Sequence, residues 1–329
     1  MRKILLMLSF LISFSPAHAQ ETCIDDKLVN HCRVWFGANA NKYPAVARGM
    51  RNQIEHFESR LGRRVDIAHT YHGVGSNQLS EDDIYFITRS DTLLMTNWKP
   101  AARWSDANGS NDAVNATIDE MAQSIKSVAP HKIFLTIYHE PEDQVEDGTS
   151  CKSYSDKPKA GTPKDYRAMW QNIRNRFDAL GVDNVVWTMN YMGYERWHCM
   201  VNDLWPGNDL VDWLTWNSYA NKRLDWPASP MRLYNFFTEN SNAEHDYLSK
   251  PWGLVEFGAI GGEEHMLKQF DAMYDAIDQD VMPRLKMYIV FDNGDARIGY
   301  TKAGRPVPEA QEHFNRFANH PRFTKPLTQ

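Results

Sequence analysis

Short runs of mainly apolar residues recur along the chain, separated by longer stretches with apolar residues every three or four positions. The runs are rich in β-branched and aromatic residues, which is typical of strands. Most stay apolar at consecutive positions, as in a parallel sheet that is covered on both faces. There are eight such runs: RVWFGANA from Arg33, RVDIAHTYH from Arg64, TLLMTNW from Thr92, KIFLTIYHE from Lys132, NVVWTMNY from Asn184, LVDWLTWNSYA from Leu210, PWGLVEFGAIG from Pro251 and RLKMYIVFDNG from Arg284.

The stretches between these runs have the spacing of amphipathic helices. In VARGMRNQIEHFESRLG the apolar residues Met50, Ile54, Phe57 and Leu61 share one helical face, and Gly62 ends the segment. AVNATIDEMAQSIKSV, PKDYRAMWQNIRNRFDALG and EEHMLKQFDAMYDAIDQDV behave likewise. Eight alternations of strand and helix predict an α/β fold, a (β/α)₈ TIM barrel built as a single domain. A doubly wound open sheet competes, but no Gly-rich dinucleotide fingerprint follows the first strand.

The first residues follow another pattern. MRKILLMLSFLISFSPAHAQ has a positive start, an apolar run from Ile4 to Phe14 and a small-residue cleavage site ending at Ala19. This is typical of a secretory signal peptide, and the run is shorter than the roughly 20 residues that span a bilayer. We therefore expect residues 1–19 to be a signal peptide, residues 20–329 to form the barrel, and the protein to be secreted or periplasmic without a membrane anchor.

Charge narrows the choice of partners. Removing the two basic residues of the signal peptide leaves 34 basic and 42 acidic residues, a net charge of −8, and no basic block stands out. This pattern predicts neither nucleic acid nor membrane as a partner and fits a neutral or cationic ligand. We expect a monomer.

Four cysteines predict two disulfides in an oxidising compartment. Of the three possible pairings we favour Cys23–Cys32, which closes a short N-terminal loop, and Cys151–Cys199, which would join two neighbouring loops of the barrel. Reduced buried thiols are the alternative. The spacing does not fit zinc.

Polar residues end most of the predicted strands, where (β/α)₈ enzymes carry their catalytic groups. Glu140 ends the fourth strand and Glu256 the seventh, on opposite sides of a barrel. Retaining glycosidases need two carboxyl groups about 5–5.5 Å apart. Glu256 is the only charge in an apolar strand and needs hydrogen bonds, which Asn217 or Tyr219 could donate. Glu256 thus fits an ionised nucleophile and Glu140, on a polar loop, an acid. The alternatives are a surface loop acid for Glu140 and a structural ion pair for Glu256.

An acid on the fourth strand and a nucleophile on the seventh resemble the large clan of retaining (β/α)₈ glycosidases. His139 before the acid, where most of those families have Asn, resembles glycoside hydrolase family 26, the β-mannanases and β-1,3-xylanases. LWPGNDLVDWLTWNSYA and KPWGLVEFGA are similar to that family's sixth and seventh strands. The resemblance implies Glu140 as acid/base, Glu256 as nucleophile and no cofactor. It also implies that His139 binds the sugar or holds the nucleophile and that Tyr219 hydrogen-bonds Glu256.

The chain departs from that family at three places. Asn97-Trp98 replaces a usual His on the third strand, Phe291-Asp292-Asn293 replaces a usual Trp on the eighth, and Pro141-Glu142 replaces Met-Asn after the acid. The binding positions nearest the chemistry, and the substrate with them, are therefore open. Strand-end tryptophans either stack on sugar faces or pack within loops. The predicted substrate-binding set is His139, Tyr219, Asn217, Trp98, His72, Glu142, Trp197, Trp205, Phe291 and Asp292.

No metal site is predicted. His69 and His72 lie three apart on a strand and so face opposite sides, and no HExxH or clustered Cys/His occurs. DNGDARIG from Asp292 is better interpreted as a turn than as a calcium loop. The sequence therefore predicts a retaining glycoside hydrolase, endo-acting on a β-linked polysaccharide, and the resemblance to family 26 implies β-1,4-mannan as first substrate. The alternatives are hydrolysis of a bacterial exopolysaccharide and a non-catalytic sugar-binding barrel. A metal hydrolase would need a ligand set that the sequence does not offer.

Overall fold

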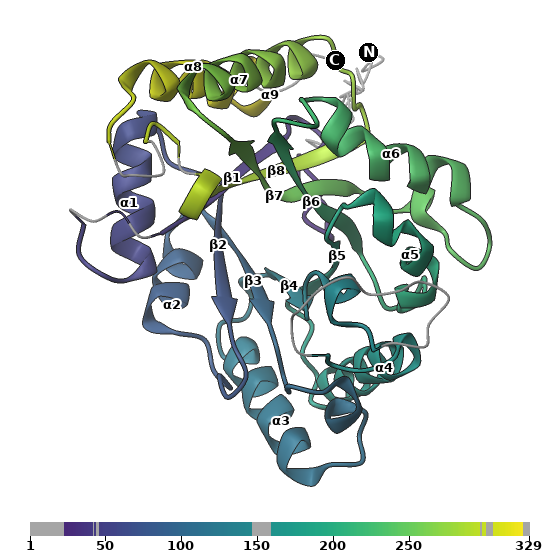
Figure 1. Cartoon of the computed structure of the whole chain (residues 1–329). Coiled ribbons are helices and arrows are strands. Elements are labelled where there is room, and N and C mark those ends of the chain that lie inside the picture. Colours follow the sequence, from purple (N-terminus) through teal and green to yellow (C-terminus); the bar gives the residue numbers. More distant parts are fainter. Residues whose placement is uncertain are drawn as a thin grey trace, which may run out of the picture.

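The computed structural model describes residues 23–41, 43, 46–146, 159–296, 298–300 and 305–324. Eight parallel strands form a closed barrel in chain order, with β8 returning to pair with β1, and helices surround it (Figure 1). The predicted (β/α)₈ fold is confirmed. The predicted signal peptide, residues 1–19, lies outside the described residues.

The strands are β1 Trp35–Ala40, β2 Ile67–His72, β3 Leu93–Trp98, β4 Ile133–Ile137, β5 Val185–Tyr191, β6 Trp213–Asn221, β7 Trp252–Ile260 and β8 Leu285–Asp292. The helices are α1 Met50–Leu61, α2 Glu81–Thr88, α3 Asp112–Lys126, α4 Pro163–Ala179, α5 His198–Leu204, α6 Ala228–Asn240, α7 Glu263–Asp278, α8 Pro308–Ala318 and α9 Pro321–Thr324. Short 3-10 turns are η1 Trp104–Ala107, η2 Pro141–Gln144, η3 Glu195–Trp197, η4 Tyr247–Ser249 and η5 Gly294–Ala296.

Local sequence signals fix several helix ends. Ser80 with Asp83 and Thr162 with Asp165 form capping boxes at the starts of α2 and α4, in which side chain and backbone satisfy each other's donors. Gly62 ends α1 as predicted, with a φ of 79° that suits glycine and an N–H bonded to the Glu58 carbonyl. These signals place each helix start close to the carboxyl end of the preceding strand.

The lower interior of the barrel is a closed apolar layer. Alternate strand residues point inward and pack together, namely Trp35, Ile67, Met95, Phe134, Val186, Trp213, Val255, Met287 and Ile289, with Leu28 from the segment before β1. The indoles of Trp35 and Trp213 donate to the carbonyls of Leu28 and Lys27, at 2.7 and 2.6 Å. The N-terminal segment therefore closes the barrel at the amino ends of its strands, and the upper interior is left for polar residues.

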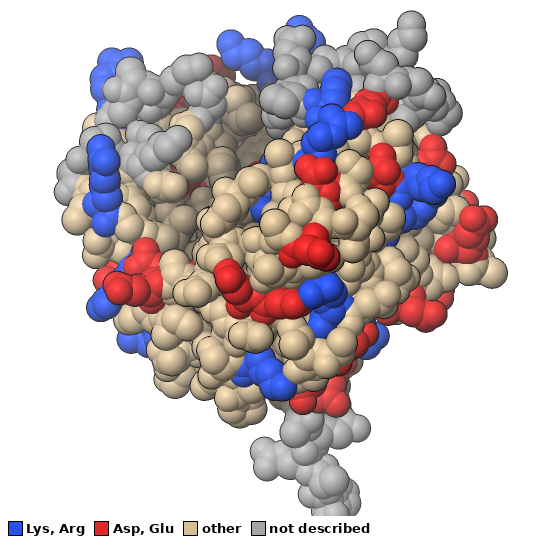
Figure 2. Space-filling model, turned by 90° about the horizontal axis from the view of Figure 1, so that it is seen from below, with Lys and Arg blue, Asp and Glu red and all other residues tan. Residues whose placement is uncertain are grey.

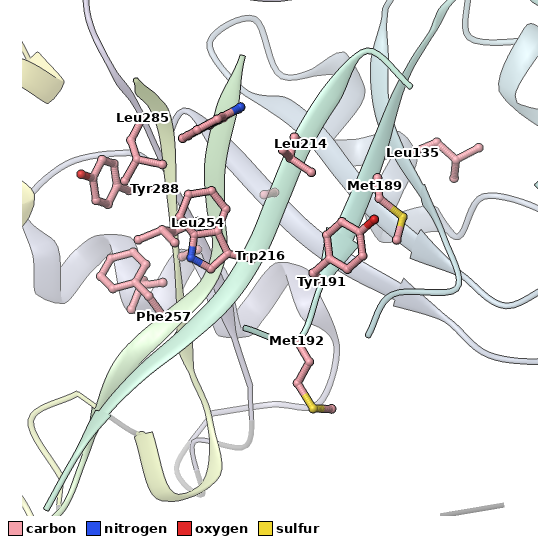
Figure 3. Packing of buried hydrophobic residues seen from close by; sticks show 14 of the residues in the cluster. Leu135, Met189, Tyr191, Met192, Leu214, Trp216, Leu254, Phe257, Leu285 and Tyr288 are labelled. Atoms are coloured by element: carbon pink, nitrogen blue, oxygen red, sulfur yellow. The ribbon is translucent and has the colours of Figure 1, made fainter. Parts of the chain in front are cut away.

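The outer faces of the strands pack against the helices in a second, larger apolar cluster. Figure 3 shows part of it, with labelled side chains from β4 to β8 that include Tyr191, Trp216 and Phe257. Trp187, Trp216 and Trp252 belong to this outer cluster and are all buried. Since the helices cover the outer faces, a strand residue reaches the substrate side only by pointing into the barrel.

Both ends of the described chain lie at the closed end of the barrel. Cys23 and Cys32 form the predicted disulfide, which constrains the N-terminal segment. The Arg33 guanidinium donates to the Phe323 carbonyl, and the Val34 N–H donates to the Arg322 carbonyl, each at 2.9 Å. Cys151, half of the second predicted pair, lies outside the described residues. In the part of the chain that the structure describes, no helix is both long enough and apolar enough to cross a membrane.

Candidate active site

A β-bulge turns Glu256 into the barrel. β6 and β7 pair residue by residue until Trp216–Leu254, and the register then shifts so that Asn217 lies opposite Glu256. Val255 already points into the apolar interior, so strict alternation would direct Glu256 outward toward the helices. The extra residue lets both face inward and returns Phe257 to the outer cluster. The bulge therefore places a carboxylate above the apolar layer of the interior.

Two tyrosine hydroxyls hold the two oxygens of the Glu256 carboxylate. Tyr71 on β2 donates to Oε1 at 2.6 Å, and Tyr219 on β6 donates to Oε2 at 2.9 Å. Glu256 is only 7 % exposed. A buried carboxylate is costly unless donors satisfy it, and hydroxyl donors to an ionised acceptor form short, strong hydrogen bonds. Glu256 is thus arranged as a fixed carboxylate with both oxygens engaged.

The same contacts keep the two tyrosines protonated. Burial, followed by the charge of Glu256, raises the pKa of Tyr71 well above its usual value near 10. Burial and Glu256 raise the pKa of Tyr219 in the same way. Neither hydroxyl therefore ionises under ordinary conditions, and both remain donors.

Glu140 lies on an irregular connection beyond β4. The backbone φ is 52° at both Tyr138 and Glu140, a left-handed conformation that is uncommon for residues other than glycine. Hydrogen bonds fix the segment, because the Tyr138 N–H donates to the Trp98 carbonyl and the Glu140 N–H to the Asn190 carbonyl at 2.9 and 3.1 Å. Such conformations cost about 1–3 kcal/mol each and gather at functional sites. Here they bring the half-buried Glu140 side chain to the barrel mouth.

A chain of amides links Glu140 to β5 and to β6, the strand that pairs with β7. The Asn217 amide nitrogen donates to Glu140 Oε1 at 2.8 Å, and its amide oxygen accepts from Asn190 at 3.1 Å. The Asn190 contact fixes which end of the Asn217 amide faces the carboxylate. Asn217 and Tyr219 lie two residues apart on the same face of β6, so their Cα atoms are about 7 Å apart. Neighbouring side chains of one strand therefore hold the two carboxylates at the same mouth.

Aromatic rings surround the Glu256 site. The His139 ring lies edge-on to Tyr71 with centroids 5.3 Å apart, and Phe291 lies edge-on to both Tyr71 and Tyr219, at 6.5 and 6.3 Å. His69 lies beside Tyr71, 4.7 Å away, fully buried in the barrel. Burial lowers the pKa of His69 to about 4, so its ring is uncharged at neutral pH. These contacts fix the Tyr71 ring.

A cavity of about 670 Å³ opens at the carboxyl ends of β6 and β7. Asn217 and Tyr219, the residues that hold Glu140 and Glu256, form part of its wall. Gly193 forms another part, with a φ of 84° and so little room that an added Cβ would lie 2.0 Å from the Asn217 carbonyl oxygen. Pockets of 300–1,000 Å³ are typical of small-ligand and substrate sites.

Six residues of the predicted substrate-binding set are buried away from this mouth. Trp98 belongs to the outer apolar cluster and donates to the Ser76 carbonyl. His72 bonds Asp83 of α2 at 2.7 Å, on the face of β2 opposite to His69. Asp292 accepts from the Ile298 N–H at 2.7 Å, Glu142 accepts from the Met192 N–H at 2.9 Å, and Trp197 and Trp205 are each 3 % exposed. The strand face or the loop packing directs each of these six side chains into protein, and their part in substrate binding stays a prediction.

Four of the ten do lie around the mouth: His139, Asn217, Tyr219 and Phe291. Sequence analysis missed Tyr71, Asn190 as a positioning residue, and Gly193. The signal for Tyr71 was present, since a strand residue two positions after His69 shares its inward face. Among the described residues no group of three or more His, Cys, Asp or Glu side chains could hold a metal ion.

No protein-family model matches the sequence, and no curated protein matches it. Solved structures do match the fold over most of the chain. A glycoside hydrolase family 26 β-mannanase from Bacteroides ovatus has a TM-score of 0.63 at 15 % identity, covering 92 % of each chain. The family 26 endo-β-1,4-mannanase catalytic domain from a Bacillus species has a TM-score of 0.63 at 12 % identity, covering 90 % of each. The family 26 domain of a mannanase/glucanase from Prevotella bryantii has a TM-score of 0.59 at 16 % identity, covering 91 % of this chain and 92 % of that one.

The chain therefore has the (β/α)₈ barrel fold of glycosidase catalytic domains. Within that class its fold is like that of glycoside hydrolase family 26, as the His-Glu pair after β4 had indicated. At these identities the likeness establishes the fold, and the chemistry has to be argued from the site.

Proposed function

We propose that the protein is a secreted, retaining glycoside hydrolase that cuts within a β-linked polysaccharide. The observation that carries this proposal is that the two carboxylates differ in burial and in hydrogen bonding. Glu256 is buried and both of its oxygens accept tyrosine hydroxyls, whereas Glu140 is half-buried at the mouth and accepts from the Asn217 amide. One group is thereby kept as a buried carboxylate, while the other can exchange protons with water.

The reaction divides between the two groups. Glu140 gives its proton to the glycosidic oxygen as the bond to the sugar's anomeric carbon breaks, and a Glu256 oxygen attacks that carbon to form an ester. Glu140, now ionised, then takes a proton from water, whose oxygen attacks the same carbon and releases Glu256. Each displacement inverts the configuration at the anomeric carbon, so the two together retain it. The single strand β6, which positions both carboxylates through Asn217 and Tyr219, supports the short separation that this route requires.

The first substrate we propose is β-1,4-mannan, because the structural neighbours include β-mannanases by name. The signal-like start of the sequence supports export. His139 and Phe291 line the site around Tyr71 and would contact the sugar next to the broken bond.

The test is release of new reducing ends from a polysaccharide panel of mannan, glucomannan, β-1,3-xylan, mixed-linkage glucan and bacterial exopolysaccharides. Glu140→Gln and Glu256→Gln keep the shape of each side chain and remove its acid-base or nucleophilic function. We expect wild type to cut one member of the panel and both variants to lose that activity while keeping the wild-type circular dichroism. NMR of the first product should show the substrate's own anomeric configuration. Equal activity in folded variants would refute the assignment of the two carboxylates.

A further inference from the structure

The cavity lined by Asn217 and Tyr219, which hold the two carboxylates, carries an unusual charge. Among the described residues, its wall contains three cationic side chains, Lys222, Arg223 and Arg232, and no acidic one. The whole chain is acidic, with 42 Asp and Glu against 36 Lys and Arg. On the face seen in Figure 2, basic and acidic side chains are interspersed, and the molecule is hollowed near the top of that view. A wall with cations only is therefore a local feature that the average composition does not explain.

A tight turn holds two of these cations at the rim. Asn221 at the end of β6 and Leu224 exchange both backbone hydrogen bonds, at 2.9 and 3.0 Å. The Asn221 side chain also accepts from the Arg223 N–H at 2.9 Å. Lys222 and Arg223 are the two residues at the tip of this turn, and both are exposed. The turn continues the strand that positions both carboxylates, so these cations have a fixed relation to the chemistry.

Neither of these two cations is neutralised within the described part of the chain. No described carboxylate lies within ion-pair distance of Lys222 or Arg223. Arg232 on α6 does have a partner, Glu195, at 3.2 Å, and both of those side chains are solvent-exposed. Exposed ion pairs of this kind are weak. The wall therefore keeps positive charge that a ligand can use.

The cavity also offers an aromatic surface. Tyr194 lines it and is 50 % exposed, which is unusual for a large apolar ring in this protein. The guanidinium of Arg196 lies 5.7 Å from the centre of that ring. Aromatic faces stack on the CH side of sugar rings. Cations beside such a ring suit a sugar that carries negative charge.

An anionic sugar would also need these cations. Glu140 and Glu256 lie at the same mouth, and carboxylates repel a negatively charged chain that approaches them. Positive charge on the neighbouring wall offsets that repulsion. A neutral polysaccharide would draw little from exposed cations, whereas a guanidinium matches the two oxygens of a carboxylate.

We propose that this site takes an acidic polysaccharide, whose sugar carboxylates bind Lys222, Arg223 and Arg232 beside the bond that is cut. The inference rests on the proposed function, since it assigns a substrate class to the same site. It replaces β-1,4-mannan as the first substrate, and also the neutral or cationic ligand that the overall charge favours.

The test compares two hexasaccharides that differ only in charge. Oligomers of β-1,4-mannose and β-1,4-mannuronate share ring and linkage, and each mannuronate has a carboxylate where mannose has a hydroxymethyl group. Binding is measured by titration calorimetry on the Glu256→Gln protein, so that nothing is cut. We expect the acidic hexamer to bind about tenfold more tightly at about 20 mM salt, with the preference shrinking at about 200 mM.

Matched variants locate the effect. Lys222→Gln/Arg223→Gln should reduce the acidic-to-neutral affinity ratio by about fivefold or more. Lys126→Gln/Lys286→Gln makes the same change in net charge at the other end of the barrel and should leave the ratio unchanged. Equal binding of the two hexamers, or an equal loss of preference in both double variants, would overturn the inference. Tighter binding of a sulfated mannohexaose than of the mannuronate hexamer would overturn the choice of carboxylate.

Hydrolysis of the same hexamers by the protein with Glu256 intact separates this inference from the proposed function. Charge-dependent binding without cleavage would support the acidic ligand and count against the glycosidase. Cleavage of mannohexaose without any acidic preference would support the glycosidase and remove the acidic ligand.

Discussion

Replacing Tyr71 by phenylalanine should slow the second half of the proposed reaction more than the first. In the first half the charge on Glu256 disappears as its oxygen bonds to the sugar. In the second half Glu256 leaves as a carboxylate, and the Tyr71 hydroxyl, 2.6 Å from Oε1, is placed to stabilise the returning charge. Loss of this donor therefore raises the barrier for release of the sugar.

The size of the effect follows from the kind of hydrogen bond. A hydrogen bond to a charged group contributes about 1.5–3 kcal/mol. With about 1.4 kcal/mol for each factor of ten in rate, turnover should fall by about 10- to 150-fold. Tyr219 still holds the other oxygen, so some stabilisation remains. The variant should accumulate sugar ester on Glu256.

The assay combines steady-state turnover with mass spectrometry of protein quenched during the reaction. Tyr191→Phe is the matched control, because it removes a buried hydroxyl that donates to the Val201 carbonyl at 2.9 Å, in the outer cluster rather than at the mouth. Both variants should lose similar stability, but only Tyr71→Phe should lose turnover and gain the mass of the bound sugar. Turnover within twofold of wild type, or a sugar ester on a residue other than Glu256, would refute the reasoning.

Four further outcomes are expected. Asn190→Ala frees the Asn217 amide and should lower kcat/KM by about tenfold with a small change in Tm. An unchanged kcat/KM would show that Asn190 is not a positioning residue. Gly193→Ala should lower activity more than stability, since its Cβ would press on the backbone of Asn217. A calorimetric scan of the variant gives the change in Tm to compare with the change in activity, and a large fall in Tm with little loss of activity would contradict the prediction. The pKa of His69 is lowered to about 4, so the unfolded state alone binds its proton between pH 6.5 and 4, and wild type should lose about 2–3 kcal/mol of stability between pH 7 and 4.5 through this group. Urea unfolding of His69→Gln at both values should show a loss smaller by that amount, and an equal loss would place the effect elsewhere. Cys23→Ser/Cys32→Ser should lower the free energy of unfolding by about 2–3 kcal/mol at 25 °C. An unchanged urea midpoint would show that the N-terminal segment closes the barrel without the disulfide.

The barrel could be predicted from the sequence because each strand is covered on both faces. Eight runs that are apolar at consecutive positions, separated by helical periodicity, leave few other folds. The same property hides which residues face inward. In β7, alternation from Val255 would direct Glu256 toward the helices, and only the register shift against β6 brings it inside. A bulge depends on contacts between strands, and no pattern within a single strand records it.

The tryptophans show a second limit. Strand-end position was the reason to expect Trp98 at the substrate, but its strand face directs it into the outer cluster, where a large ring fills space between strand and helix. Tyr71 was missed for the reverse reason, because its neighbours His69 and His72 seemed the chemical residues of that strand. Facing direction, rather than residue type, separates the two cases. The cations at Lys222 and Arg223 gain meaning only when the turn places them on the wall of the cavity.

The closed end of the barrel offers a practical handle. The segment around Lys27 and Leu28 and the last helix, near Phe323, meet there, at the end opposite the two carboxylates. A surface or a second protein joined to this end would therefore lie away from the mouth. Immobilised on a bead through this end, the enzyme would present its open mouth to insoluble polysaccharide.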